Sequence, residues 1–331
     1  MSSPEPIVAK GLGRQFGDNV VIEPLDVSVD RGQRVGIVGA DGAGKTTLLQ
    51  MLAGILDPTV GECRVLGFDT RREAKQVAAR IGYMSQGFTL YDRLSVKENL
   101  SFAARIRDVP DELYRERSER LLSMSGLGRF TDRPAAKLSG GMQKKLSLCT
   151  NLVHEPELLI LDEPGLGVDP LSRRHLWTML DRFRSQGLTM VVATSYMDEA
   201  ERCDRILLLE QGRVLADGSL EELLRPAAGR VFTVNAGDTG RGLRELSGIL
   251  AQIDSVHSVQ WLPDHLPARR VIARGNPPGG GRAPARGSVC AADGQEGRRA
   301  AVSGIGPARQ GKRGRAGGHR PERPLRTFQG R

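Results

Sequence analysis

Gly39-Ala-Asp-Gly-Ala-Gly-Lys45-Thr46-Thr47 decides the fold class of this chain. An apolar run at 34–38 precedes this stretch and a helix-forming run at 48–53 follows it, so the order is strand, glycine-rich loop, helix. The glycines let successive backbone N–H groups point at one place, where the helix adds the positive end of its dipole. The stretch therefore predicts a loop that binds a nucleoside triphosphate. We expect ATP to contact Gly39, Ala40, Asp41, Gly42, Ala43, Gly44, Lys45, Thr46 and Thr47.

A second motif carries two carboxylates. Residues 158–161 are all apolar, and Asp162 and Glu163 follow them directly. An aspartate at the end of a buried strand beside a phosphate loop can hold Mg²⁺ through water, and a glutamate after it can polarise the attacking water. We expect Thr46 and Asp162 to hold Mg²⁺, with Lys45 and Glu163 as catalytic residues. An exposed acidic turn is the alternative, and it is weak at this separation from a phosphate loop.

The composition bounds the other possibilities. A chain of 331 residues holds two ordinary domains, or one of about 220 residues with extensions. It has no run of apolar residues long enough to span a membrane, and its first residues lack the pattern of a secretory signal. The four cysteines lie far apart without a CxxC pair, which favours free thiols in a reducing compartment. These features predict a cytosolic protein.

The positive charge is confined to the end of the chain. The formal net charge is +9, but residues 269–331 hold 14 Arg and one Lys against three acidic residues, so residues 1–268 carry −3. Because the part expected to fold is mildly acidic, a nucleic-acid partner is unlikely on this pattern.

The hydrophobic pattern predicts an α/β fold. Alternating runs between residues 7 and 29 suit an antiparallel sheet. Residues 93–155 are helical in pattern, which we interpret as an insertion in the α/β domain. Continuously apolar runs suit parallel strands buried on both faces, and they lie at 35–38, 158–162, 190–193 and 206–209.

Two further segments follow the α/β domain, which we place at 5–225 with a helical subdomain at about 88–155. Residues 226–268 have strand-like runs at 231–234 and 256–261 around a helix-like run at 243–253, typical of a small α+β module. Residues 269–331 contain 14 glycines and seven large apolar residues, too few to offset the entropy of ordering. We expect a disordered Arg/Gly/Pro-rich tail there.

The most specific motif is Lys137-Leu-Ser-Gly-Gly-Met-Gln143. It resembles the LSGGQ signature of the nucleotide-binding subunits of ABC transporters. Met142 stands in place of the consensus glutamine, a replacement that is frequent in the drug-exporter branch. Ser139 is placed to cap a helix whose first N–H groups, freed by Gly140 and Gly141, form a second anion site. In the family this site closes over the nucleotide of a partner cassette. The resemblance thus implies a P-loop NTPase fold with a RecA-like core and an active dimer.

Other motifs follow in the family's order. Phe16 stands where an aromatic side chain stacks on adenine, and core packing is the equally weighted alternative. Residues 83–86 match the Q-loop, which implies that Gln86 is a catalytic residue that contacts Mg²⁺ or the attacking water. Residues 90–100 resemble the surface that receives the membrane subunit, or form a generic helical surface. Residues 167–170 resemble the D-loop, whose Asp169 lies at the dimer interface.

One position departs from the family. After the run at 190–193 the family has a switch histidine, and this chain has Ser195. A serine can donate or accept a hydrogen bond, but it carries no positive charge and has a shorter reach toward the γ-phosphate. We expect weaker stabilisation of the transferring phosphoryl group.

The resemblance covers residues 7–268 and is closest to the first cassette of tandem-cassette exporter ATPases. The second cassette expected afterwards is missing, and residues from about 270 on have the composition of a GC-rich gene read out of frame. Our hypothesis is that a frameshift produced this tail, which sequencing of the locus would test.

The resemblance implies a peripheral ATPase at the cytoplasmic face of the inner membrane. It would bind a membrane-spanning permease and form a homodimer, or a heterodimer with a second cassette. A hydrolysis-poor cassette that lends its signature motif to a partner site is one alternative, favoured by Ser195. A soluble ABC ATPase acting on ribosomes or nucleic acid is another. The transported substrate is not encoded in this chain.

Overall fold

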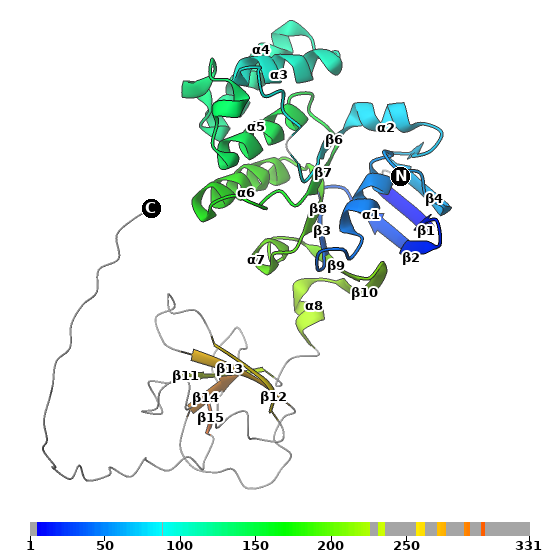
Figure 1. Ribbon diagram of the computed structural model, residues 1–331, viewed down its shortest axis with the longest axis vertical. Helices are drawn as coiled ribbons and strands as arrows, with labels where there is room; N and C mark the ends of the chain where they lie inside the picture. Colours follow the sequence, from blue (N-terminus) through cyan, green and yellow to red (C-terminus); the bar gives the residue numbers. More distant parts are fainter. Residues whose placement is uncertain are drawn as a thin grey trace, which may run out of the picture. The chain divides into compact units, whose positions relative to one another are not determined.

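A computed structural model describes residues 5–87 and 89–225, and the backbone of five later strands between 231 and 301. The chain divides into two compact units, residues 1–226 and 227–331 (Figure 1). Each unit is described separately.

A six-stranded sheet forms the centre of the first unit, in the order β10-β9-β3-β8-β7-β6. All neighbours pair in parallel except the edge strand β10. The four predicted parallel strands are confirmed, whereas β6 and β10 were not predicted, because β6 is short and β10 is only half buried. The strands are β3 (Arg34–Val38), β6 (Ile81–Met84), β7 (Leu158–Asp162), β8 (Thr189–Thr194), β9 (Arg205–Glu210) and β10 (Arg213–Gly218).

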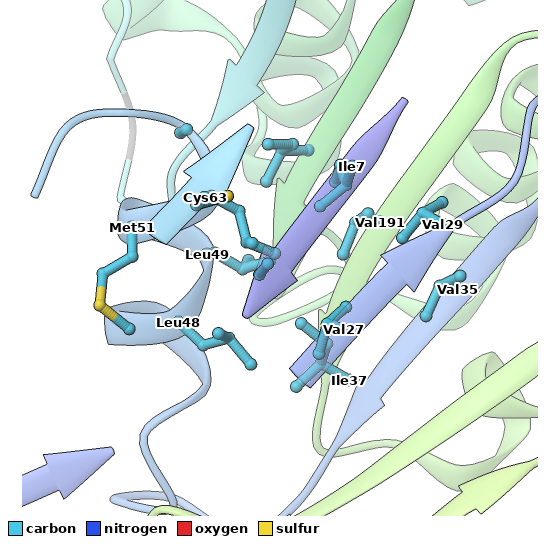
Figure 2. Packing of buried hydrophobic residues seen from close by; sticks show 14 of the residues in the cluster. Ile7, Val27, Val29, Val35, Ile37, Leu48, Leu49, Met51, Cys63 and Val191 are labelled. Atoms are coloured by element: carbon cyan, nitrogen blue, oxygen red, sulfur yellow. The ribbon is translucent and has the colours of Figure 1, made fainter. Parts of the chain in front are cut away.

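Both faces of this sheet are buried, which explains the continuous apolar runs. Along β7, Leu158 and Ile160 belong to a core shared with helix α1 (Lys45–Leu52). Leu159 and Leu161 belong to a second core on the other face, shared with helices α5 (Gly140–Leu152) and α6 (Pro170–Ser185). Figure 2 shows the first core, with α1 beside strands of both sheets.

An antiparallel sheet covers the other side of α1, as the alternating pattern predicts. Its order is β2-β1-β4-β5, and β1 and β2 run longer than the predicted segments. Its strands are β1 (Ile7–Phe16), β2 (Asn19–Val29), β4 (Val60–Val65) and β5 (Phe68–Asp69), and helix α2 (Ala74–Arg80) leads from it to β6.

A helical insertion lies between β6 and β7, as expected (Figure 1). Ser95 opens its first helix through a capping box with Glu98, and Gly126 ends its second in a left-handed conformation. The insertion contains α3 (Val96–Ile106), α4 (Asp111–Ser125), two 3₁₀ turns (Gly128–Phe130, Ala135–Lys137) and α5 (Gly140–Leu152).

The remaining helices of this unit are α6 (Pro170–Ser185), α7 (Met197–Ala200) and α8 (Leu220–Leu224). Within the part of the chain that the structure describes, none of the helices has the length and apolar character needed to span a membrane. The architecture expected from the sequence for the first unit is confirmed: an α/β core, an antiparallel subdomain and a helical insertion.

The second unit contains a five-stranded antiparallel sheet in the order β12-β13-β11-β14-β15. Its first two strands in the chain coincide with the predicted strand-like runs, and the helix expected at 243–253 lies outside the described residues. Three of its strands fall within 269–331, where the sequence predicted a disordered tail without strands. The rest of that range lies outside the described residues, so disorder there stays a prediction. The strands are β11 (Val231–Asn235), β12 (Val256–Trp261), β13 (Arg270–Gly275), β14 (Ser288–Ala291) and β15 (Arg299–Ala301).

Candidate functional site

Predicted site residues follow three neighbouring strands of the central sheet, at the carboxyl-terminal ends of those strands. Val38 of β3 pairs with Thr194 of β8, and Ala193 of β8 pairs with Asp162 of β7. Parallel strands in this register end together, so the residues that follow them leave the sheet side by side. The phosphate loop, Glu163 and Ser195 meet there for this reason.

The glycines of the loop are required by its backbone. Gly42 and Gly44 have φ values of 81° and 101°, in the left-handed region that favours glycine. At Gly39 a Cβ would lie 2.2 Å from the carbonyl oxygen of Leu209, so only glycine fits against β9. Helix α1 then begins at Lys45 without a side-chain cap, which leaves its first N–H groups directed to a ligand.

Lys45 is buried at the base of the loop. Its Nζ donates to the carbonyl oxygens of Gly39 at 2.8 Å and Ala40 at 3.1 Å. It also forms an ion pair with Glu163 Oε1 at 3.1 Å and donates to Ser195 Oγ at 2.9 Å. A bound triphosphate would have to replace Glu163 as the main partner of this ammonium group.

Glu163 is held in an unusual conformation. Its φ is 49°, left-handed for a residue with a side chain, and its N–H donates to Ala193 O at 3.0 Å. Its carboxylate accepts from Ser195 Oγ at 2.8 Å and from Ser195 N at 3.2 Å. Backbone strain of this kind persists where neighbouring contacts impose it, and it is common at functional sites.

Thr46 and Asp162, the residues predicted to hold Mg²⁺, are in contact. The Thr46 hydroxyl donates to Asp162 Oδ2 at 2.8 Å. The other oxygen, Oδ1, is buried and has no hydrogen-bond partner among the described residues. Burial raises the pKa of Asp162, and the hydrogen bond from Thr46 opposes this rise. A hydroxyl beside a carboxylate with a spare oxygen fits the oxygen preference of Mg²⁺.

Lys45, Thr46 and Glu163 line one cavity of about 320 Å³, whereas Asp162 and Ser195 contact these residues without being among those that line it. Gln86, which follows β6, is exposed and lines this cavity, as the Q-loop assignment implies. The cavity is lined by Val21, Asp41, Gly42, Gly44, Lys45, Thr46, Thr47, Gln86 and Glu163.

Phe16 lies at the end of β1 and is 46% exposed. This exposure favours a ligand-facing ring over the alternative of core packing. The guanidinium of Arg14 lies 4.3 Å from the ring centroid, so a cation already covers part of the ring.

The signature residues begin helix α5. Ser139 caps α5 by accepting from Met142 N at 3.4 Å, as predicted, and Gly140 and Gly141 open the helix. None of the three is among the described residues that line the cavity around Lys45. Asp169 caps α6, accepting from the N–H groups of Leu171 and Ser172 at 3.1 and 2.9 Å. Its role at a dimer interface stays a prediction.

Two residues near the site were not assigned a role from the sequence. Lys144 is 2% exposed, and its Nζ donates to the carbonyl oxygen of Gln86 at 2.7 Å. Tyr83 is half-buried beside Asp162, and burial together with that carboxylate raises its pKa to about 12. The sequence contained a signal for Lys144. In a helix, residues three and four positions apart share a face, so Lys144 lies on the same face as Ser147 and Leu148, which are buried.

A second cavity, of about 210 Å³, lies over α3. The rings of Tyr91 and Phe102 meet edge to face there, with centroids 4.5 Å apart. Ile106 also lines it and is 60% exposed. This is the surface for which residues 90–100 predict contact with a membrane subunit.

Comparison with known proteins places these features in a family. Residues 22–165 match the family model described as "ABC transporter". The chain is 45% identical over 236 residues to the probable multidrug ABC transporter ATP-binding protein YbhF of Escherichia coli (strain K12), covering 71% of this chain and 41% of that protein. It therefore spans less than half the length of that relative.

Shorter relatives are covered more fully. The Nod factor export ATP-binding protein I of Ralstonia nicotianae is 35% identical, with 75% of this chain and 78% of that protein covered. The daunorubicin resistance ATP-binding protein DrrA3 of Streptomyces coeruleorubidus is also 35% identical, with 75% and 80% covered.

A solved structure of an ATP-binding subunit of an ABC transporter is 29% identical to this chain. It superposes with a TM-score of 0.62 over 74% of this chain and 99% of that one. The fold described above is thus that of a P-loop NTPase cassette. The chain belongs to the ABC transporter family, among its ATP-binding proteins.

Proposed function

We propose that this chain is the ATP-binding and ATP-hydrolysing subunit of an exporter. The observation that carries the proposal is that Lys45, Thr46 and Glu163 line one cavity, where Lys45 pairs with Glu163 and Thr46 is bonded to Asp162. The names of the relatives, which refer to multidrug transport, Nod factor export and daunorubicin resistance, support export of small molecules.

The residues divide the chemistry among them. The N–H groups of the loop and Lys45 bind the phosphates, and Mg²⁺ held near Thr46, Asp162 and Gln86 would neutralise charge on the phosphate oxygens. Glu163 accepts the proton of the water whose oxygen attacks the γ-phosphorus. The bond from that phosphorus to the bridging oxygen breaks, which releases ADP and phosphate.

The signature site supports a dimer. Ser139, Gly140 and Gly141 cap a helix outside the cavity of their own chain, so they are available to a nucleotide held by a second cassette. The second cassette is another copy of this chain or a different ABC cassette. The cavity lined by Tyr91, Phe102 and Ile106 supports binding to a membrane-spanning permease, with the chain peripheral at the cytoplasmic face of the inner membrane.

A second candidate is a cassette that binds ATP but hydrolyses it poorly, and Ser195 favours it. In place of a histidine, a neutral hydroxyl contacts both Lys45 and Glu163. Such a cassette would act by lending its signature residues to a partner site. A soluble ATPase that acts on ribosomes or nucleic acid has no comparable support in the described site.

The ATPase rates of the wild type, Glu163→Gln and Ser195→His separate the two candidates. A fast wild type that Glu163→Gln inactivates supports hydrolysis at this site. A wild type as slow as Glu163→Gln, with a gain in Ser195→His, supports the hydrolysis-poor cassette. Ser185→His, an exposed serine on α6, is the matched control for an added histidine.

A further inference from the structure

Lys144 is a buried cation to which the chemistry above gives no task. It lies in the first half of α5, the helix that Ser139 caps, and its side chain is 2% exposed. Burying an ammonium group is costly unless the group is hydrogen-bonded and its charge is compensated. A lysine at such a position therefore needs a specific reason.

The hydrogen bond of Lys144 reaches the nucleotide cavity. Its Nζ donates to the main-chain oxygen of Gln86 at 2.7 Å, across 58 positions of the sequence. Gln86 follows β6 and lines the cavity beside Lys45. A charge-assisted bond of this length fixes the Gln86 main chain relative to α5.

The carboxylates of Asp162 and Glu163 offset part of the cost of burying the charge of Lys144. Burial lowers the pKa of Lys144, while the negative charges of Asp162 and Glu163 raise it. Conversely, the positive charges of Lys45 and Lys144 both lower the pKa of Asp162, against the larger effect of its burial. Lys144 thus belongs to the electrostatic environment of the nucleotide site as well as to the signature helix.

We propose that Lys144 is a positioning residue that ties the signature helix to Gln86, so that the end of α5 facing a partner and the Mg²⁺ site of the same chain move together. The observation is that a buried side chain on the helix that Ser139 begins donates a hydrogen bond to the segment that carries Gln86. This inference rests on the proposed function, because it assigns Gln86 a role at Mg²⁺.

The next residue provides a matched control. Lys145 Nζ also donates to a main-chain oxygen, that of Ser125 at 2.9 Å, at the end of α4. Both lysines are on the same helix and make the same kind of bond, but only Lys144 contacts Gln86. A general loss of helix packing would affect both positions, whereas loss of the proposed link affects Lys144 alone.

The test uses the full chain in two measurements. Without nucleotide, hydrogen exchange of the amides at 85–87 should be at least about tenfold faster in Lys144→Met and Lys144→Gln, and unchanged in Lys145→Gln. The affinity for a fluorescent ATP analogue is then measured with and without Mg²⁺. In the two neutral variants we expect the gain from Mg²⁺ to fall by about tenfold and the Mg²⁺-free affinity to stay within about twofold.

Lys144→Arg should restore both quantities, because it keeps the charge and the donor. Thermal unfolding identifies variants that fail to fold. If Lys144→Met does not fold, Lys144→Gln decides the question. Wild-type exchange and a full Mg²⁺ effect in a folded Lys144→Gln would overturn the inference. A wild type without Mg²⁺-dependent nucleotide binding would instead refute the proposed function, and the exchange measurement would still decide the role of Lys144.

Discussion

The hydroxyl of Ser195 donates to Oε1 of Glu163 at 2.8 Å, and the backbone N–H of Ser195 donates to Oε2 at 3.2 Å. One residue at the end of β8 therefore contacts both oxygens of the proposed general base. The sequence predicted that a serine here can form a hydrogen bond but reaches less far toward the γ-phosphate than a histidine. The register of β7 and β8 brings its hydroxyl within hydrogen-bond distance of Glu163.

Removing this hydroxyl should slow catalysis. In Ser195→Ala we expect kcat to fall by about tenfold with KM within about threefold, because a hydrogen bond to a charged group contributes about 1.5–3 kcal/mol. Steady-state ATPase measurements check this, with Ser185→Ala as the control. An unchanged kcat would show that Glu163 is oriented without the serine.

Neutralising Glu163 should strengthen nucleotide binding while it abolishes turnover. Glu163 and Lys45 are both nearly buried and 3.1 Å apart, so ATP has to compete with this carboxylate for the ammonium group. We expect Glu163→Gln to bind ATP about tenfold more tightly, equivalent to about 1.4 kcal/mol. Equilibrium binding to a fluorescent ATP analogue measures it.

Asp132→Asn is the control for that experiment. Asp132 pairs with Lys97 at 2.5 Å in the helical insertion and does not line the nucleotide cavity, and its side chain is 78% exposed. Solvent screens this pair, so its removal should change ATP affinity little. Equal gains in the two variants would contradict the importance of the buried pair.

The two signature glycines should differ in their tolerance of alanine. A Cβ at Gly141 would lie 2.5 Å from the Cβ and Oγ of Ser172, whereas one at Gly140 would meet only the Gly167 oxygen at 3.7 Å. We expect Gly141→Ala to destabilise the fold by about 1–3 kcal/mol and Gly140→Ala to change it by less than about 1 kcal/mol. Thermal unfolding of the two variants gives the comparison, and equal stability would refute it.

Phe16 should affect ATP binding without affecting stability. Because the ring is 46% exposed, we expect Phe16→Ala to change the melting temperature little. Loss of stacking on a base costs about 1–3 kcal/mol, so ATP affinity should fall about tenfold while tripolyphosphate affinity is unchanged. Val20→Ala, at a 50% exposed position on β2, is the control. Equal losses for both ligands would argue against stacking.

His154 should make the fold sensitive to mild acid. Its Nε2 lies 3.0 Å from the Ile81 oxygen, and burial followed by the charge of Arg107 lowers its pKa from 6.5 to about 4. The unfolded chain therefore binds the proton more tightly, so this contribution to stability is complete above pH 6.5 and is lost as the pH falls toward 4. Linkage gives a loss of about 2 kcal/mol by pH 5.

Urea unfolding at pH 7.5 and pH 5 measures this loss. His154→Gln should reduce the difference between the two pH values, and His175→Gln, at an exposed position on α6, should leave it unchanged. An identical pH dependence in His154→Gln would assign the acid sensitivity to other groups.

Much of the site could be predicted because its motifs are local. A phosphate loop needs consecutive residues between one strand and one helix, so residues 39–47 are enough to predict it, and Gly42 and Gly44 have the positive φ values that such a loop requires. The Ser139 cap is equally local, since a side chain and an N–H three residues later form it. The edge strand β10 could not be predicted, because exposed positions along it interrupt the apolar pattern.

The sequence alone determined which residues can bind phosphate and Mg²⁺, because those capacities depend on residue types at short spacing. Only the tertiary structure decided which of them meet. Strand register brings Ser195 to Glu163 over 32 positions, and the packing of α5 brings Lys144 to Gln86 over 58. Contacts between residues so far apart depend on the pairing of strands and the packing of a helix, and no local pattern in a single sequence records that arrangement.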